Sequence, residues 1–119
     1  MSVKIKRGFV YLADLNPKTG TEPGKVRPVL VVQTNMLNTL HPSTVVCPLT
    51  TNVERSAHIL RVYMKKGQAG LNKDSDIMID QIRAIDNRRL MKELGEVPRR
   101  VLDAVSQNVA LVLDLPSAI

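Results

Sequence analysis

One arginine is placed where proteins often bind phosphate or carboxylate groups. Arg27 follows a loop, residues 16–26, that is rich in glycine, proline and hydroxyl side chains, and it precedes the apolar run 29–32. Pro28 fixes its own φ and favours an extended backbone at Arg27. Because proline lacks a backbone N–H, it is tolerated only at the start or edge of a strand. The sequence therefore predicts a guanidinium at the mouth of a rigid strand, beside a loop.

Short strand-like segments fill the first three quarters of the chain and would hold this arginine in place. Their apolar patterns predict strands at 9–13, 29–32, 44–50, 58–64 and 76–85, the third of them broken late by Pro48. From Pro98 to Pro116 the apolar period becomes helical, and 86–92 is expected to form a short helix. These elements predict a mainly β fold, a small curled sheet or barrel with a C-terminal amphipathic helix packed against it.

Length and composition favour one globular domain that spans residues 1–119. Hydrophobic residues make up 44% of the chain and charged residues 24%, as in ordinary folded proteins. No apolar run approaches the ~20 residues needed to cross a bilayer, and no secretory leader is evident, so a cytoplasmic location is expected. The lone Cys47 is predicted to be a buried core residue, and one cysteine with two scattered histidines predicts no metal site and no cofactor.

The charge of the chain points to acidic or polyanionic partners. Seventeen Lys and Arg residues against eleven Asp and Glu residues give a net charge of +6 and a pI near 9.8. Such a surface favours polyanions, but charge alone does not choose between nucleic acid, a membrane and an acidic protein tail. Aromatic residues make up only 3% of the chain, so a bound nucleic acid is expected to be held mainly by polar contacts and not by stacking platforms.

Several motifs together resemble the MazF/PemK family of toxin endoribonucleases from bacterial type II toxin–antitoxin pairs. The central pattern is Gly-Thr-Glu at 20–22, four further residues, and then Arg-Pro-Val at 27–29. Order and spacing agree across separate loops and strands, at 6–8, 14–17, 20–22, 26–33, 44–50, 73–75 and 80–83. Two residues depart from the family pattern, since Phe9 stands where an aspartate is common and Pro23 where a glutamine is common.

This resemblance implies an SH3-like barrel that pairs into a homodimer. It also implies cleavage of single-stranded RNA, usually messenger RNA, at short sequence motifs without a metal ion. An antitoxin with an acidic, flexible tail would occupy the RNA groove, and no membrane partner is implied. In such a reaction the ribose 2′-hydroxyl attacks the adjacent phosphorus, and the products are a 2′,3′-cyclic phosphate and a 5′-hydroxyl end.

The resemblance also implies roles for individual residues. Arg27 matches the family's catalytic arginine, although a structural pairing with Glu22 remains an alternative. Thr50 matches the catalytic threonine, which without the family would be read as an ordinary end of a strand. The expected RNA-binding residues are Thr21, Glu22, Lys25, Gln81 and Arg89. The general base is left unassigned, because His41 and His58 fall outside the family's catalytic positions.

Two other functions are compatible with a barrel of this kind. One is a non-enzymatic toxin similar to the CcdB relatives that bind DNA gyrase, which would not need an arginine at a strand start coupled to a distant threonine. The other is an RNA-binding barrel without nuclease activity, because a fold does not dictate its chemistry.

Overall fold

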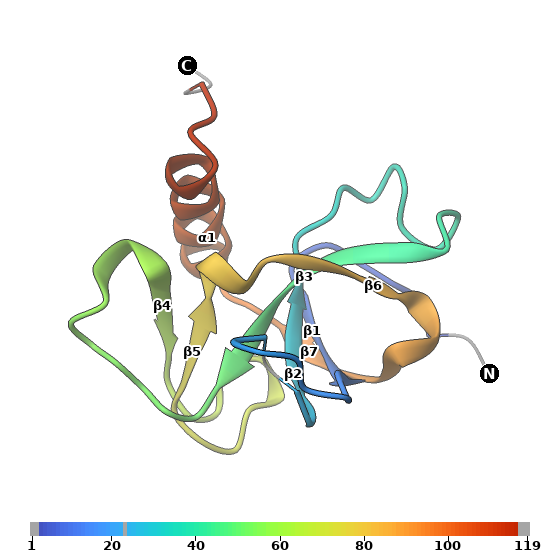
Figure 1. Ribbon diagram of the computed structural model, residues 1–119, viewed down its shortest axis with the longest axis horizontal. Coiled ribbons are helices and arrows are strands. Elements are labelled where there is room, and N and C mark those ends of the chain that lie inside the picture. Colours follow the sequence, from blue (N-terminus) through green and yellow to red (C-terminus); the bar gives the residue numbers. More distant parts are fainter. Residues whose placement is uncertain (1–2, 23, 117–119) are drawn as a thin grey trace.

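Seven antiparallel strands form a curled sheet that is covered by one long helix (Figure 1). The computed structural model describes residues 3–22 and 24–116, so Pro23 lies outside the described residues. The strands are β1 (Phe9–Asp14), β2 (Val26–Val31), β3 (Ser43–Thr50), β4 (Arg61–Met64), β5 (Ser75–Met78), β6 (Arg83–Asp86) and β7 (Leu90–Glu96), and helix α1 spans Arg99–Val112. Their order is β4-β5-β3-β2-β1-β7, with β6 also paired to β3. The prediction of a mainly β fold with a C-terminal helix is confirmed.

Strand β3 belongs to two sheets, and the expected break at Pro48 does not occur. Residues Ser43 to Val46 pair with β6, whereas Leu49 and Thr50 pair with β5. Pro48 lies in the gap between these two ladders, so its missing N–H interrupts neither of them. A larger sheet of β7, β1, β2, β3 and β6 is thereby joined through β3 to a smaller sheet of β3, β5 and β4.

Two predicted strands are shorter than their apolar patterns suggested. In 58–64 the first three residues form a 3₁₀ turn, which begins at His58 with a left-handed φ of 49°, and the strand starts at Arg61. The long strand predicted at 76–85 is divided by a 3₁₀ turn at Ile79–Gln81. This turn redirects the chain from the end of β3 that β5 occupies to the end that β6 occupies.

The short helix predicted at 86–92 was mostly wrong. Only Asn87–Arg89 forms a 3₁₀ turn, where the Asp86 side chain accepts a hydrogen bond from the Arg88 N–H. The chain then continues as β7, which pairs with β1. Only Leu90 of this strand is buried, so its sequence lacks the alternation of buried and exposed residues by which strands are recognised.

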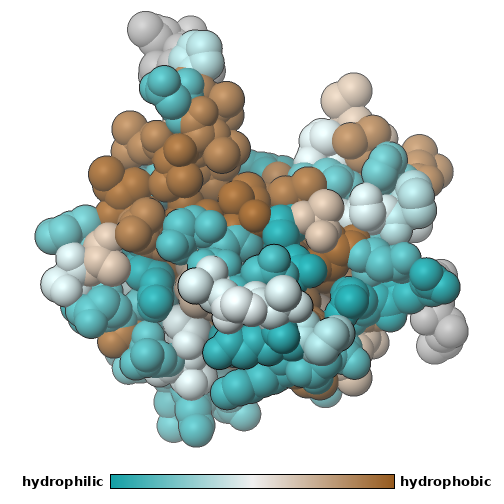
Figure 2. Space-filling model, in the orientation of Figure 1, coloured by the Kyte–Doolittle hydropathy of each residue, from teal (hydrophilic) through white to brown (hydrophobic). Residues whose placement is uncertain are grey.

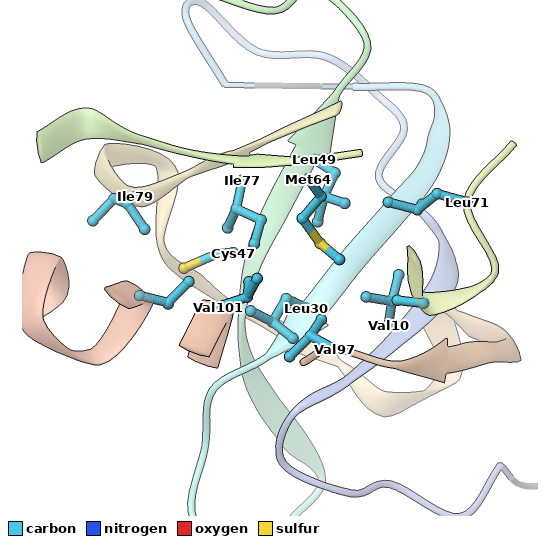
Figure 3. Close-up of a cluster of buried hydrophobic side chains, with 12 residues drawn as sticks. Val10, Leu30, Cys47, Leu49, Met64, Leu71, Ile77, Ile79, Val97 and Val101 are labelled. Carbon is cyan, nitrogen blue, oxygen red and sulfur yellow. The ribbon is translucent and has the colours of Figure 1, made fainter. Parts of the chain in front are cut away.

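Two hydrophobic clusters pack the two faces of the curled sheet. The cluster drawn in Figure 3 includes Val10, Leu30 and Met64, and Val101 and Val105 bring helix α1 against it. Cys47 belongs to the same cluster, and burial raises the pKa of its thiol to about 12, as expected for a core residue. The other cluster consists of Ile5, Tyr11, Ala13, Leu15, Val29, Val31, Val46, Ile85 and Leu90.

Within residues 3–22 and 24–116, no helix is long and apolar enough to cross a membrane.

Candidate active site

The guanidinium of Arg27 is fixed by two backbone carbonyls. Its Nε donates to the Gly24 carbonyl at 2.9 Å, and an η nitrogen donates to the Leu49 carbonyl of β3 at 3.1 Å. Strand β2 pairs with β3 only from Val29 onward, so the edge of β2 at Arg27 is open on that side. An arginine has five N–H donors, and these two bonds to described residues leave part of the fork available for a ligand.

Thr50 lies across the same opening. The β2–β3 register joins Val29 to Pro48 and Val31 to Val46, and its continuation places Thr50 opposite Arg27 on one face of the sheet. Both residues line a cavity of about 250 Å³, together with Lys25 and Ser75. The Thr50 Oγ1 accepts a hydrogen bond from the Asn52 N–H at 3.1 Å, so its own hydroxyl proton can be donated to a ligand.

The electrostatics of the cavity favour an anion. Burial lowers the pKa of the Arg27 guanidinium from its ordinary value, because a partly desolvated charge loses hydration. The ordinary value is so high that the group stays cationic near neutrality. Lys25 adds a second positive charge at the rim. A cation with reduced hydration and free N–H donors is suited to the oxygens of a phosphate group.

A buried carboxylate that is not among the residues predicted from the sequence holds the turn that follows Thr50. Asp76 of β5, which is 1% exposed, pairs with Thr50 in the sheet register. Its Oδ2 accepts from the Glu54 N–H at 2.7 Å and from the Arg61 side chain at 3.2 Å. An acidic residue at the head of the apolar run 76–79 was the available signal, because buried carboxylates require partners.

Of the three predicted loop residues, Lys25 alone lines the cavity. Thr21 and Glu22 are exposed on the preceding loop. The Glu22 carboxylate lies 3.9 Å from the Arg83 side chain of β6, and both described donors of Arg27 bind carbonyls. The structure thus places Glu22 beside Arg83, and not in the pairing with Arg27 that was the alternative.

Gln81 and Arg89 do not line this cavity. Gln81 ends the turn between β5 and β6 and is partly exposed. Arg89 donates from one η nitrogen to the Asp14 carbonyl at 2.9 Å and to the Asn16 carbonyl at 2.7 Å. It therefore anchors the start of the loop that leads from β1 to Arg27.

Neither histidine lies in the cavity. His41 is exposed and its Nδ1 lies 3.2 Å from the Ser43 carbonyl and hydroxyl, and His58 begins the 3₁₀ turn before β4. No group of three His, Cys, Asp or Glu residues that could hold a metal ion occurs in the described part of the chain.

Phe9, the described departure from the family pattern, is anchored by a lysine. The Lys6 Nζ lies 4.0 Å from the centroid of the Phe9 ring and 2.9 Å from the Glu93 carboxylate of β7. This stacked cation connects the start of β1 to β7, away from Arg27.

Sequence comparison identifies relatives over most of the chain. The family model described as "PemK-like, MazF-like toxin of type II toxin-antitoxin system" matches residues 6–113. The endoribonuclease EndoA of Bacillus subtilis is 35% identical over 111 residues, which cover 93% of this chain and 96% of that protein.

Solved structures share the fold. A MazF from Deinococcus radiodurans superposes with a TM-score of 0.82 at 23% identity, covering 96% of this chain and 100% of that one. A mycobacterial endoribonuclease in complex with its cognate antitoxin gives a TM-score of 0.73 at 26% identity and covers 94% and 95% of the two chains.

Proposed function

The chain belongs to the family of PemK-like, MazF-like endoribonuclease toxins of type II toxin–antitoxin systems, and we propose that it cuts single-stranded RNA, messenger RNA in particular, with Arg27 and Thr50 and without a metal ion. One observation carries the assignment of these two residues. They come from different strands, 23 positions apart in the sequence, and line the same cavity from opposite sides. Cleavage at a short recurring sequence motif is part of the proposal.

The proposed reaction uses the RNA's own nucleophile. The 2′-hydroxyl loses its proton and forms a bond to the adjacent phosphorus, while the bond to the 5′ oxygen breaks and that oxygen gains a proton. Negative charge gathers on the non-bridging oxygens in the transition state, where Arg27 supplies a fixed positive charge. The Thr50 hydroxyl donates to one of these oxygens, and its own oxygen accepts a hydrogen bond from the Asn52 N–H, which orients it.

Lys25 and the loop before Arg27 are proposed to guide the RNA backbone into the cavity. Lys25, Thr21 and Glu22 are exposed on this loop, and Lys25 reaches the cavity rim. Gln81 and Arg89 are proposed to contact RNA outside the cavity. Each phosphate neutralised by a cation releases counterions, so raising the salt concentration should weaken RNA binding steeply. The logarithm of the binding constant should fall with the logarithm of the salt concentration, with a slope of roughly −0.7 per contacted phosphate. A flat salt response would count against this groove.

A second copy of the chain is proposed to cover an exposed apolar surface at the end of helix α1 and in the residues that follow it. Leu111, Leu113 and Leu115 are each at least half exposed at the C-terminal end of the chain, where Figure 2 shows apolar atoms gathered around the helix. Leu111 and Val112 line a hollow of about 390 Å³ together with Ile59 and Leu60. Exposed apolar patches of this kind mark interaction sites. Light scattering should report a dimer, and Leu113→Glu should shift it to the monomer.

An antitoxin with an acidic, flexible tail is proposed to silence the enzyme by occupying the same cationic cavity. The net charge of +6 and the free donors of Arg27 support this partner chemistry. A cytoplasmic location is proposed as well, because messenger RNA is found there.

The test is an RNA cleavage assay in EDTA with mapped ends. We expect cleavage of a mixed-sequence RNA at a short recurring motif with 5′-hydroxyl ends, and a loss of about 10²- to 10³-fold in rate for Arg27→Ala. Thr50→Val removes one hydrogen bond to a charged group and should cost about 10- to 150-fold. The matched control is Thr34→Val, because the Thr34 hydroxyl accepts from the Met36 N–H in the same local geometry, away from the cavity.

The same assay separates the alternatives. Intact RNA that is nevertheless retained by the protein would indicate a binding module without nuclease activity. Intact, unbound RNA together with capture of DNA gyrase would indicate a CcdB-like toxin. Equal cleavage rates for the wild type and Arg27→Ala would refute the assigned site.

A further inference from the structure

The row of side chains at the proposed active site continues across the smaller sheet to an aromatic ring. Thr50 pairs with Asp76 of β5, and Asp76 pairs with Tyr63 of β4. Residues that face each other across antiparallel strands project to the same side of the sheet. Neighbouring strands lie about 4.8 Å apart, so Tyr63 stands roughly 10 Å from Thr50 along this row. That separation suits the base of a neighbouring nucleotide.

The Tyr63 ring is held from two sides. The Asp74 carboxylate beside its hydroxyl raises the pKa of Tyr63, and the Arg55 guanidinium carbon lies 4.1 Å from the ring centroid. Arg55 is exposed on the turn that follows Thr50. A guanidinium at this distance forms a second flat layer over the ring, with its other side towards solvent.

The position of Arg55 depends on the buried carboxylate already described. Asp76 accepts from the backbone N–H of Glu54, the residue before Arg55. It also binds Arg61, which in turn donates to the Asn52 carbonyl at 3.2 Å. The turn that carries Arg55 is therefore pinned at two points, and the charge of Asp76 is offset by Arg61. The pair is preorganised and does not need to be assembled by a ligand.

Tyr63 is the aromatic residue that this row can offer to a ligand. The chain contains two tyrosines, one phenylalanine and no tryptophan. Tyr11 is fully buried, and Phe9 lies at the far end of β1, where Lys6 covers its ring. Low aromatic content led us to expect mainly polar contacts, but the structure places this one ring in the same row as Thr50.

We propose that the stacked pair of Arg55 and Tyr63 is a nucleobase-binding subsite for a nucleotide next to the cleaved linkage. The proposal rests on the proposed RNA cleavage at Arg27 and Thr50. A base stacks on the open side of the Arg55 guanidinium, whose other side rests on the Tyr63 ring. This arrangement tolerates any of the four bases, because every base has a flat π face.

The first test compares three variants on an RNA oligonucleotide that contains the mapped cleavage motif. Tyr63→Leu keeps the packing of β4 and removes the aromatic face, and it should raise KM roughly 5- to 150-fold while kcat changes less. Tyr63→Phe keeps the ring and should cleave like the wild type. Arg55→Ala changes an exposed side chain, so the variant should fold normally, and it should also raise KM. Thermal unfolding of each variant shows whether it is folded.

The second test replaces single bases of the oligonucleotide by abasic sites. In the wild type, one abasic position beside the cleaved linkage should raise KM, and in Tyr63→Leu the same replacement should have no further effect. For a binding readout without cleavage, Tyr63→Trp combined with Arg27→Ala contains a single tryptophan, and its fluorescence should be quenched by the intact oligonucleotide but not by the abasic one.

The outcomes separate this proposal from the one on which it rests. If the wild type cleaves RNA but Tyr63→Leu and Arg55→Ala retain its KM, or if the abasic penalty is equal in wild type and Tyr63→Leu, the subsite is refuted and the cleavage site stands. If the wild type cleaves no RNA, the proposed function itself fails. If the intact and the abasic oligonucleotides quench the tryptophan fluorescence equally, stacking is rejected whatever the cleavage activity.

Discussion

Removing the Asp76 carboxylate should destabilise the protein by an amount that follows from its two contacts. The side chain is 1% exposed and accepts one hydrogen bond from the Glu54 N–H and one from Arg61. A buried hydrogen bond to a charged group contributes about 1.5–3 kcal/mol. The bond to Arg61 contributes less, about 1 kcal/mol, because that side chain is 24% exposed. Asp76→Ala should therefore cost about 3 kcal/mol of the free energy of unfolding.

This cost converts into a measurable shift of the unfolding temperature. For 119 residues the entropy of unfolding is about 0.25 kcal/mol/K, so 3 kcal/mol lowers Tm by about 12 °C. Asp76→Asn keeps one acceptor oxygen, loses the charge and replaces the other oxygen by an NH2 group. Weakening the charged hydrogen bonds to neutral ones costs about 1 kcal/mol, so its Tm should fall by about 5 °C. Scanning calorimetry of both variants at neutral pH gives these values, with Glu54→Gln as an exposed control that should shift Tm by less than about 2 °C.

A double-mutant cycle identifies the source of the loss. Asp76→Ala and Arg61→Ala should be less destabilising together than the sum of the two single variants, because both remove the same bond. A Tm for Asp76→Ala within 2 °C of the wild type would refute the reasoning, since it would mean that the carboxylate gains nothing from these partners.

Three further outcomes are expected. Arg89→Ala removes both bonds to the carbonyls of Asp14 and Asn16. Limited proteolysis should therefore cut the loop between β1 and β2 faster, and the KM for RNA should rise several-fold. Unchanged proteolysis would show that other contacts hold the loop. Cys47, with a pKa of about 12 and no exposure, should resist iodoacetamide at pH 8 until the protein is unfolded, and prompt labelling of the native protein would contradict its burial. The pKa of Asp86 is lowered to about 2, mainly by the Arg88 hydrogen bond. The wild type should therefore be more stable than Asp86→Asn above pH 4, and this difference should disappear as the pH falls towards 2. Denaturant midpoints of both proteins at several pH values test this sign.

The sequence predicted the central strands, which are the most buried, and missed β7, in which only Leu90 is buried. Strands β1, β2 and β3 carry near-continuous apolar runs, so their existence could be read from periodicity. In strand β7 only Leu90 is fully buried, and the strand is held by its pairing with β1, a long-range interaction that no local pattern records. The turn at 79–81 was missed for the same reason. It occurs where the chain stops pairing with one end of β3, as β5, and starts pairing with the other end, as β6.

The candidate site was predicted unevenly for a similar reason. Arg27 was identifiable because a proline and a glycine-rich loop surround it in the sequence. Thr50 required the resemblance to a family, because a threonine at a strand end is common and its position opposite Arg27 is set by the register between β2 and β3. Asp76, Arg61 and Tyr63 come together only through pairing in the smaller sheet, so neither composition nor spacing pointed to them as a group.

Strand β3 has a consequence for how proteins of this architecture can diversify. Arg27 belongs to the larger sheet, while Asp76 and Tyr63 belong to the smaller one, and only β3 with its gap at Pro48 is common to both. Substitutions at Tyr63 on β4 can therefore change how strongly a neighbouring base is held without altering the strand that carries Arg27. Affinity for RNA can then evolve separately from the proposed cleavage chemistry.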